Sequence, residues 1–212
     1  MTTAITLYGT PLSGHTHRVE LLLRMLDLPH AVVTADADVR GSVEFLALNP
    51  LGQIPVLVDG DLAVPDSIAI LVYLARCYDR AGTWAPAEAV AAARVQRWLS
   101  VAADDVRHGP GSARMVVQWG LPGHLPLART IAARLLPFMD VHLADRHYLA
   151  DEAGAVATHP TIADLACYSY VAHAPEGGIS LEGYDHLNAW LRRVEVLPGF
   201  KGMPSSPIPP SA

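Results

Sequence analysis

The sequence has little of what marks several classes of protein. Its two cysteines, Cys77 and Cys167, lie far apart in apolar helical patterns, which predicts buried thiols and no disulfide framework. No apolar run is long enough to span a bilayer, and no basic segment followed by an apolar one opens the chain, so we expect a cytoplasmic protein. The 15 Lys and Arg residues form no stripe and are outnumbered by 21 Asp and Glu residues, which argues against a nucleic-acid partner.

Several catalytic motifs are missing as well. No G-x-x-x-x-G-K-[ST] or G-x-G-x-x-G pattern lies at a strand–helix junction, so a nucleotide cofactor is not indicated. Ser13 lies in the run L-S-G-H and not in G-x-S-x-G, which disfavours a serine hydrolase. His15 and His17 are two positions apart on a predicted helix and face different ways. No further ligands at suitable spacing complete a set, so we expect no metal site.

The chain up to about residue 79 alternates between strand and helix patterns. Apolar residues make up 51% of the sequence, which is enough for a substantial core. The predicted strands cover residues 5–8, 30–33, 56–58 and 62–64. The predicted helices cover residues 14–26, part of 35–48, and 67–78. This order, βαβ and then ββα, predicts an α/β domain at residues 1–79.

Beyond a linker at residues 80–87, only helical patterns follow, which predicts an all-helical domain at residues 88–202. The expected helices cover residues 88–106, 125–143, 161–173 and 187–194. His108–Gly111 is expected to break or kink the first of these, with a further helical turn through Met115–Trp119. The tail from Met203 onward contains four prolines and little apolar material, so we expect it to be loose.

The helix that follows Ser13 has the clearest chemical potential. A short strand leads through small residues into this helix, whose apolar positions Val19, Leu22 and Leu23 mark one buried face. The N–H groups at its start have no partner within the helix and carry the positive end of its dipole. The Ser13 hydroxyl at this point is suited to cap the helix or to donate to a bound anion. A thiolate held there is stabilised, because a helix N-terminus lowers the pKa of a thiol.

Two further dipeptides allow both a structural and a functional reading. A cis bond occurs in about 5–6% of X-Pro pairs, so trans is the default for Ile54-Pro55. A cis bond would turn the peptide groups of Ile54 outward, where they could pair with a peptide-like ligand. Asp66 and Ser67 are typical helix caps. The same hydroxyl, at a helix N-terminus, is equally suited to hold a carboxylate, and Asp66 to pair with a neighbouring ammonium.

Three segments together resemble the cytosolic glutathione transferases of the serine type. They are LYGTPLSGHTHRVELLLRMLDLP, NPLGQIPVLVDGDLAVPDSIAILVYLA and HPTIADLACYSYVAHAPEGG, in that order along nearly the whole chain. The resemblance implies the glutathione transferase fold, which is a thioredoxin-like N-terminal α/β domain followed by an all-helical C-terminal domain. It also implies a homodimer. The Thr161 hydroxyl and the Asp164 carboxylate match the family's helix-capping box, which has a role in folding.

The resemblance also implies roles for residues in the N-terminal domain. Ser13 matches the catalytic serine that hydrogen-bonds the glutathione sulfur. Pro55 matches the family's cis-proline, which overrides the trans default, and the Ile54 backbone then pairs with the cysteinyl part of glutathione. Asp66 and Ser67 match the acidic–serine pair at the γ-glutamyl end, although glutamate is more frequent at the first position.

Two candidates remain for the glycyl carboxylate of glutathione, and the second substrate is less well defined. Gln53 and Arg40 are the candidates, and Arg40 lies in a loop that varies between family members. The implied function is a detoxifying conjugation of the glutathione thiolate to a small hydrophobic electrophile. Candidate residues for the electrophile side are Leu12, His108, Met115, Trp119 and Tyr168.

Two alternatives stay open beside conjugation. The first is a glutathione-dependent disulfide or peroxide reductase, which serine in place of cysteine at position 13 weakens. The second is a non-catalytic binding module with the same fold. The presence of Ser13, Ile54-Pro55 and Asp66-Ser67 together argues against this second alternative.

Overall fold

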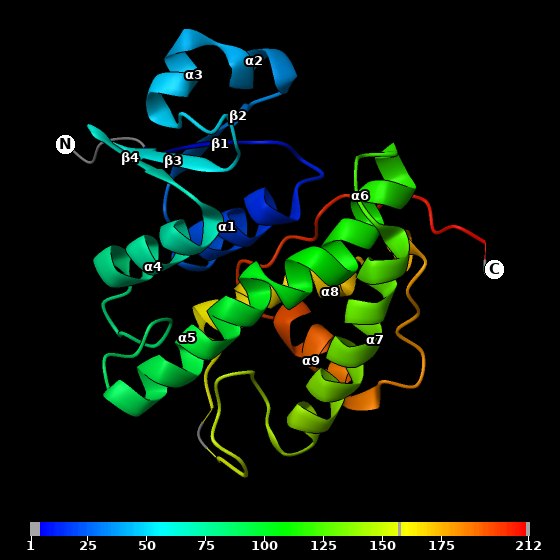
Figure 1. The fold of residues 1–212 in the computed structure, drawn as a ribbon. Helices are drawn as coiled ribbons and strands as arrows, with labels where there is room; N and C mark the ends of the chain where they lie inside the picture. Colours follow the sequence, from blue (N-terminus) through cyan, green and yellow to red (C-terminus); the bar gives the residue numbers. More distant parts are fainter. Residues whose placement is uncertain (1–4, 157, 211–212) are drawn as a thin grey trace. The chain divides into compact units, whose positions relative to one another are not determined.

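A computed structural model describes residues 5–156 and 158–210 of the chain, which folds into two compact units (Figure 1). Unit 1 is formed by the residues up to Gly82 together with Leu197–Pro204. Unit 2 is formed by Thr83–Val196 together with the residues from Ser205 onward. The bounds expected from the sequence, 1–79 and 88–202, do not anticipate the return of Leu197–Pro204 to unit 1.

Unit 1 is built on a mixed four-stranded sheet with the strand order β2-β1-β3-β4. The strands are β1 (Ile5–Gly9), β2 (His30–Thr34), β3 (Val56–Asp59) and β4 (Leu62–Pro65). β1 pairs with β2 in parallel and with β3 in antiparallel orientation, and β3 pairs with β4 in antiparallel orientation. The helices are α1 (Gly14–Met25), α2 (Ala37–Gly41), α3 (Val43–Leu48) and α4 (Ser67–Tyr78). Figure 1 shows α1 and α4 on one side of this sheet and α2 and α3 on the other.

The alternation of side chains along the strands explains why both faces of the sheet are covered. Leu7 and Leu57 lie opposite one another in the β1–β3 register and are fully buried. Val56, one position from Leu57, points to the other face and packs with Phe45 of α3 and with Ala35. A sheet that is apolar on both faces needs helices on both sides, as this one has.

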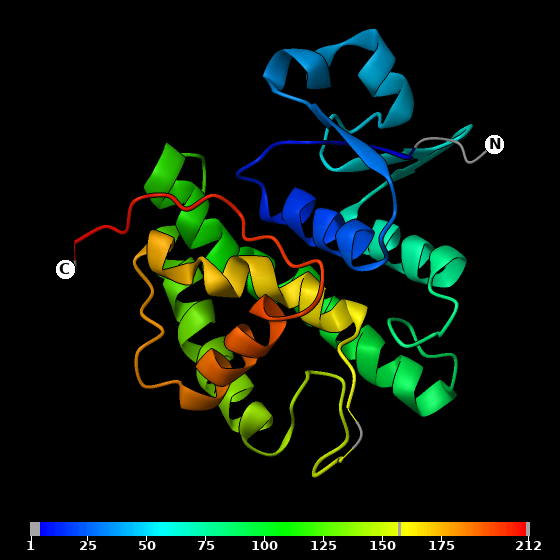
Figure 2. The ribbon, with the colours of Figure 1, turned by 180° about the vertical axis from the view of Figure 1, so that it is seen from behind.

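Unit 2 consists of helices. They are α5 (Ala89–Ala103), η1 (Arg107–Gly111), α6 (Ser112–Trp119), α7 (Leu125–His142), η2 (Leu143–Asp145), α8 (Ile162–Ala172), η3 (Ala174–Gly177) and α9 (Asp185–Glu195). Helix α8 is the centre of the unit, since residues 162–171 are all buried. It packs beside α5 and α9, as Figure 2 shows. Trp98 of α5 and Trp190 of α9 are the largest fully buried side chains of the core.

The start of α8 confirms the predicted capping box. Asp164 is fully buried, and its carboxylate accepts hydrogen bonds from the backbone N–H of Thr161 at 2.8 Å and of Leu149 at 2.9 Å. It also accepts from Trp190 Nε1 at 2.9 Å. Burial raises the pKa of Asp164 to about 6, against the opposing effect of these donors. The carboxylate therefore ties the start of α8 to α9 and to the loop before it.

The strand and helix order and the all-helical second part confirm the predicted fold class. Several details differ from prediction. Residues 35–48 form two short helices and not one, because Ser42 ends α2 and caps α3. At His108–Gly111, which is predicted to break or kink the helix, one π-helical turn that contains Pro110 interrupts the regular α-helix between α5 and α6. Cys77 is exposed because it lies on the outer face of α4, whereas Cys167 is buried as predicted.

The expectation of a loose tail is wrong for the described residues after Met203. Met203 is itself buried. In unit 2, the Ser206 N–H donates to Glu176 at 2.9 Å, and Gln118 Nε2 donates to the carbonyl oxygen of Pro207 at 2.8 Å. Backbone polar groups thus hold a segment whose composition offers few apolar contacts.

Among the described residues, no helix is long and apolar enough to cross a membrane.

Candidate functional site

Unit 1 contains a hollow of about 230 Å³ beside the start of β3 and the end of β4. The residues that line it come from α1, from the loop between α3 and β3, from the end of β4 and from the start of α4. They are His15, Asn49, Leu51, Gln53, Ile54, Pro55, Pro65, Asp66 and Ser67. Five of these, Gln53, Ile54, Pro55, Asp66 and Ser67, are residues that the sequence predicts to bind one ligand. Three separate stretches of chain therefore converge on one small cavity.

The loop before β3 is held by its own polar groups. Asn49 is buried, and its Nδ2 donates to the Gln53 carbonyl oxygen at 2.9 Å, while its Oδ1 accepts from the Leu51 N–H at 3.2 Å. The Ile54-Pro55 peptide bond is cis, as the resemblance implies. Gln53 itself is exposed at the rim. The Asn49 side chain thus fixes the loop that carries Gln53 and Ile54 beside the hollow.

Asp66 caps α4 from an unusual backbone conformation. Its Oδ1 accepts from the N–H groups of Ile68 at 2.8 Å and Ala69 at 3.0 Å. Its φ of 74° and ψ of 124° lie outside the regions that residues with a side chain normally occupy. Such conformations cost on the order of 1–3 kcal/mol and occur most often at functional sites. Here the strained residue is at the rim of the hollow.

Ser67, directly after Asp66, is 3% exposed and contacts two side chains of α1. Arg18 Nη1 donates to Ser67 Oγ at 3.4 Å, and His15 Nδ1 lies 3.3 Å from the same oxygen. Arg18 is fully buried. A buried guanidinium and a histidine from one helix therefore both reach the hydroxyl at the start of another helix.

Ser13 is the N-cap of α1, as predicted. Its Oγ accepts from the Thr16 N–H at 3.2 Å, and it is half-buried. The preceding turn is tight, because Thr16 Oγ1 accepts from the Thr10 N–H at 3.3 Å. A Cβ on Gly9 would lie 2.3 Å from the Thr16 side chain, so the turn requires glycine there. Ser13 is not among the residues that line the hollow, although His15, two positions later in the sequence, is.

The two residues predicted as candidates for the glycyl carboxylate, Gln53 and Arg40, lie in different surroundings. Gln53 lines the hollow, whereas Arg40 does not. The Arg40 Nε donates to the Asp36 carbonyl oxygen at 3.2 Å, one turn earlier on its own helix. This local contact directs the guanidinium along α2.

The five candidates for the electrophile side are distributed over both units. Leu12 belongs to unit 1, and His108, Met115, Trp119 and Tyr168 belong to unit 2. Trp119 is 42% exposed, with the Arg114 guanidinium 4.8 Å from its ring centroid. His108 is exposed and its Nδ1 lies 3.0 Å from Asp104 Oδ1.

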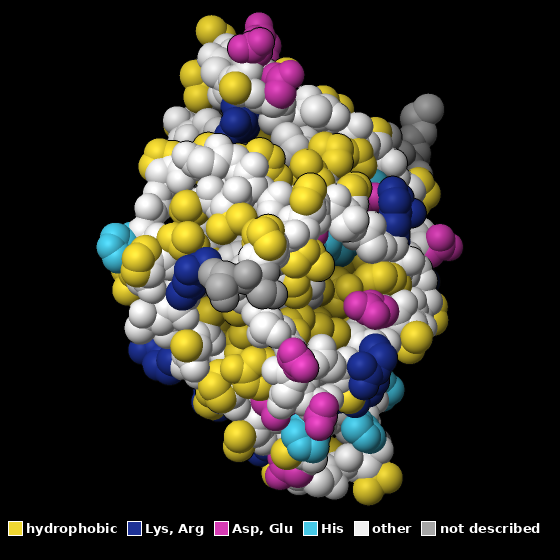
Figure 3. Space-filling view, turned by 90° about the vertical axis from the view of Figure 1, so that its right-hand side faces the viewer, with side chains coloured by type: hydrophobic (Ala, Val, Ile, Leu, Met, Phe, Trp, Pro, Cys, Tyr) yellow, Lys and Arg dark blue, Asp and Glu magenta, His cyan; other side chains and the backbone are white. Residues whose placement is uncertain are grey.

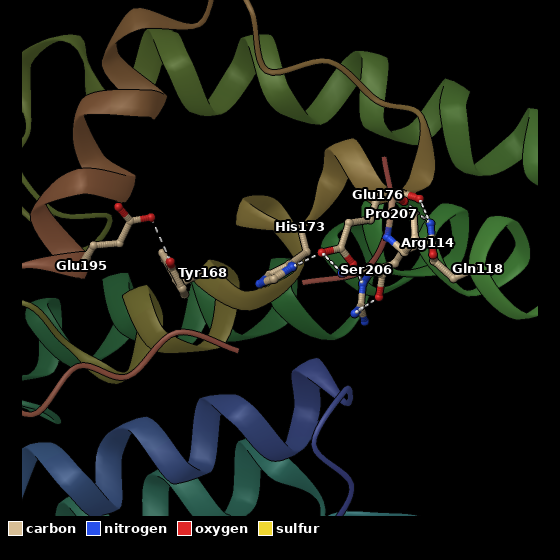
Figure 4. A network of polar contacts seen from close by, with 8 residues as sticks. All are labelled: Arg114, Gln118, Tyr168, His173, Glu176, Glu195, Ser206 and Pro207. Carbon is tan, nitrogen blue, oxygen red and sulfur yellow. Dashed lines mark hydrogen bonds and ion pairs between the residues drawn. The ribbon is translucent and has the colours of Figure 1, made fainter. Parts of the chain in front are cut away.

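Tyr168 has a different environment from the other candidates. It is 4% exposed, packs edge-on against Trp190, and donates its hydroxyl to Glu195 Oε1 at 3.0 Å (Figure 4). Burial and the Glu195 carboxylate raise the pKa of Tyr168 above its usual value, so the hydroxyl stays a neutral donor. These contacts are those of a core tyrosine.

A second polar network in unit 2 joins α6, η3 and the tail (Figure 4). Arg114 and Glu176 form a buried ion pair, and His173 Nδ1 lies 2.6 Å from the other oxygen of the same carboxylate. Burial alone would raise the pKa of Glu176, but hydrogen bonds from the Ser206 N–H, from Arg114 and from His173 hold it below its usual value. Glu176 is therefore a fixed anion that anchors the tail to the helices.

Two further observations concern metal ligands and surface charge. Within residues 5–156 and 158–210, no group of three or more His, Cys, Asp and Glu side chains is arranged to hold a metal ion. On the face drawn in Figure 3, the described Lys and Arg side chains lie apart from one another and form no stripe.

Reasoning from the sequence missed the contribution of His15 and Arg18 to this site. They are three residues apart, so they lie on one face of α1. Arg18 lies three and four positions before Leu21 and Leu22, so the sequence alone puts an arginine on the same helix face as two apolar residues, which is a signal for a special role. That the shared target of both side chains is Ser67, 49 positions after Arg18, only the fold reveals.

Comparison with known proteins identifies the family. The model of the glutathione S-transferase N-terminal domain matches residues 7–82. Glutathione S-transferase 3 of Zea mays is 32% identical to this chain over 96% of the chain and 95% of the relative. A glutathione S-transferase structure from Pseudomonas fluorescens has a TM-score of 0.85 at 29% identity, covering 95% of this chain and 99% of that one. A glutathione transferase homologue from Drosophila mojavensis with bound glutathione has a TM-score of 0.77 at 26% identity, over 92% and 89% of the two chains. The chain belongs to the glutathione S-transferase family of enzymes.

Proposed function

We propose that this protein binds glutathione in the hollow of unit 1, ionises its thiol and transfers the thiolate sulfur to a small hydrophobic electrophile. The observation that carries the proposal is the convergence of Gln53, Ile54-Pro55 and Asp66-Ser67 on a single cavity. The family relationship and the Drosophila mojavensis homologue with bound glutathione support the choice of ligand.

The polarity of the hollow matches the groups along glutathione. The γ-glutamyl carboxylate fits the Ser67 hydroxyl at the positive end of the α4 dipole. The γ-glutamyl ammonium fits the Asp66 carboxylate, whose strained backbone supports a role in binding. The Ile54 backbone is assigned to the cysteinyl part, and Gln53, which lines the hollow, is assigned to the glycyl carboxylate in preference to Arg40.

Ser13 is assigned to the sulfur. Because its Oγ accepts from the Thr16 N–H, the hydroxyl proton is not used in that contact and is suited to donate to a thiolate. An unperturbed thiol has a pKa of about 8.5 and is only slightly ionised at neutral pH. Lowering this pKa by about two units makes the thiolate dominant and corresponds to about 2.7 kcal/mol. The N-terminus of α1 and the Ser13 hydroxyl together supply this stabilisation.

The reaction itself is the attack of the thiolate on an electrophilic carbon. A lone pair of the sulfur forms the new C–S bond. In a substitution, the leaving group departs with its bonding pair, and in an addition, the displaced pair takes up a proton from water. Within unit 2, exposed Trp119, half-buried Met115 and exposed His108 are suited to contact a hydrophobic electrophile. Within unit 1, Leu12 is the candidate for this role. Tyr168 is the weakest candidate, because it is buried and contacts Trp190 and Glu195.

The remaining parts of the proposal follow from the family. We propose a homodimer, located in the cytoplasm, that takes part in detoxification. Light scattering after size exclusion tests the first point: a mass about twice that of the 22.7 kDa chain supports a dimer, and a mass about equal to that of the chain contradicts it.

The test of the catalytic assignment is the ultraviolet absorbance of the glutathione thiolate, titrated with the protein across pH. The wild type is expected to ionise bound glutathione well below its free pKa, and Ser13→Ala is expected to raise that pKa by one unit or more. Ser42→Ala is the matched control, because Ser42 caps α3 in the same way, with Oγ 3.2 Å from the Phe45 N–H. Both variants lose a cap worth about 0.5–2 kcal/mol, but only Ser13 is assigned to the sulfur in this proposal.

The outcomes separate the competing functions. A depressed pKa that does not depend on Ser13 would mean that the helix N-terminus or another group activates the thiol. Absence of glutathione binding would remove the catalytic assignment and favour a binding module. If glutathione binds and is ionised but disulfides or peroxides are consumed faster than alkylating electrophiles, the reductase alternative replaces conjugation.

A further inference from the structure

We infer that His15 is a positioning residue that directs the hydroxyl proton of Ser67 into the hollow, so that the site selects a carboxylate at this point. The inference rests on the proposed function, because the carboxylate in question is that of the γ-glutamyl end of glutathione. His15 belongs to α1 and contacts Ser67 at the start of α4, which packs beside α1.

The geometry places three groups around one oxygen. Ser67 Oγ is buried, lies 3.4 Å from Arg18 Nη1 and lies 3.3 Å from His15 Nδ1. His15 and Ser67 both line the hollow, whereas Arg18 is fully buried beneath them. The hydroxyl therefore has protein partners on two sides and the cavity on the third.

The number of donors and acceptors around Ser67 Oγ decides whether a proton or a lone pair of this hydroxyl faces the hollow. A serine hydroxyl has one proton to donate and two lone pairs to accept with. Arginine has donors only, so one lone pair of Ser67 Oγ is taken by Arg18. If His15 Nδ1 carries a proton, it takes the second lone pair, and the hydroxyl proton is left to point into the hollow. If His15 Nδ1 carries none, it accepts that proton, and only a lone pair faces the hollow.

The surroundings favour the first arrangement when a ligand is bound. The start of α4 is the positive end of its dipole, and the buried Arg18 guanidinium adds a full positive charge beneath the hydroxyl. Asp66 is the acidic group at this rim, and its Oδ1 is engaged by the N–H groups of Ile68 and Ala69. An anionic ligand group is thus favoured next to Ser67, and an anion requires the hydroxyl proton. His15 supplies the donor that leaves this proton available.

The experiment compares two ligands that differ only at the group in question. S-methylglutathione removes thiol ionisation from the measurement, so that Ser13 does not influence it. The second ligand is the S-methyl tripeptide in which 4-aminobutanoate replaces the γ-glutamyl residue, which deletes only its α-carboxylate. Isothermal titration gives the dissociation constant of each ligand for the wild type, His15→Ala and His15→Asn.

His30→Ala is the matched control variant. His30 is in the same unit, and its Nδ1 lies 2.7 Å from a backbone carbonyl, that of Leu28, but it does not line the hollow. His15→Asn keeps an amide nitrogen at about the distance of Nδ1 from the backbone, so it is suited to donate to Ser67 Oγ. Thermal unfolding of all variants checks that each is folded before binding is compared.

The expected result is selective. His15→Ala weakens S-methylglutathione binding about threefold to tenfold, the range of a single hydrogen bond, and leaves the binding of the decarboxylated ligand unchanged. His15→Asn restores at least half of the loss on a logarithmic scale, and His30→Ala matches the wild type. If the decarboxylated ligand binds too weakly to measure, the rescue by His15→Asn against His15→Ala decides.

Two results overturn the inference without touching the proposed function. An equal loss for both ligands would mean that His15 only supports the structure of the hollow. An unchanged affinity of His15→Ala for S-methylglutathione would mean that Ser67 orients its proton without help. Failure of the proposed function looks different, because then the wild type itself does not bind S-methylglutathione.

Discussion

Helices α4 and α8 both begin with a hydroxyl and a carboxylate, and they differ in where these groups are directed. At α8, Thr161 and Asp164 are buried and bond to each other at 3.3 Å, as well as to backbone groups of unit 2. At α4, Ser67 is buried but lines a hollow, and Asp66 is exposed in a strained conformation. Similar residues therefore make two kinds of cap. We call the cap of α8 closed, because its polar groups are buried and bonded within the protein, and the cap of α4 open, because its residues line a hollow.

The difference shows what distinguishes a polar cap that supports the fold from one that is suited to bind a ligand. Each oxygen of Asp164 is fully engaged by donors from the loop, from its own helix or from Trp190. A group in this position has nothing left to offer a ligand. Ser67 instead keeps one side toward the cavity. Residue type and spacing are similar at the two helices, and the surroundings decide the role.

The strongest test of the comparison is removal of the closed cap. Asp164→Ala is expected to lower the free energy of unfolding by about 3–5 kcal/mol, because it leaves several buried donors without an acceptor. Urea unfolding followed by circular dichroism measures this. Thr161→Ala is the smaller reference change, expected to cost about 1 kcal/mol. A loss below 1 kcal/mol for Asp164→Ala would show that the α8 cap is as open as the α4 cap.

The pH dependence of stability sharpens the same point. Burial raises the pKa of Asp164 to about 6 in the folded protein, above its ordinary value of 3.8. The folded state then binds more protons than the unfolded state between these values, so stability falls as pH rises from about 4 to about 6. A shift of about two units corresponds to roughly 3 kcal/mol. Urea unfolding of the wild type should lose this amount relative to Asp164→Asn, which does not titrate, and a constant difference across that range would contradict the assignment.

Much of the fold could be predicted because its signals are local. The helix after Ser13, the hairpin at Gly60 and the cap at Thr161 each depend on residues within a few positions of one another. The tail was mispredicted for the opposite reason. Its anchor is Glu176, thirty positions before Ser206, and composition carries no information about such a partner.

Ser67, Ile54 and Pro55, which the sequence predicts to bind one ligand, line a single hollow in the structure. Their binding of glutathione stays a prediction. The contacts of His15 and Arg18 with Ser67 were not predicted, because they arise only when α1 packs beside α4. Periodicity shows which face of α1 is buried, but not which hydroxyl of another helix that face meets.

Substitution of Asp66, the strained residue at the start of α4, is expected to affect stability and glutathione binding differently. Asp66→Gly and Asp66→Ala both remove the carboxylate and are expected to weaken glutathione binding about tenfold or more. Glycine accepts a positive φ and is a better N-cap than alanine, so Asp66→Gly should be more stable than Asp66→Ala by about 1–2 kcal/mol. Chemical unfolding and isothermal titration on the same samples measure the two effects. Equal stability of the two variants would mean that the conformation at Asp66 is not strained.

The smallest expected effect concerns Glu176, the buried carboxylate of unit 2 that accepts from the Ser206 N–H and holds the tail. Ser206→Pro removes the N–H that donates to Glu176, while Ser206→Ala keeps it and removes only the hydroxyl near Arg114, at 3.4 Å. The proline variant is expected to lose about 1 kcal/mol of unfolding free energy, and the alanine variant less than half of that. Urea unfolding gives both values, and limited proteolysis after residue 204 reports release of the tail. If the two variants behave alike, the backbone donation does not hold the tail, and Glu176 is satisfied by Arg114 and His173 without it.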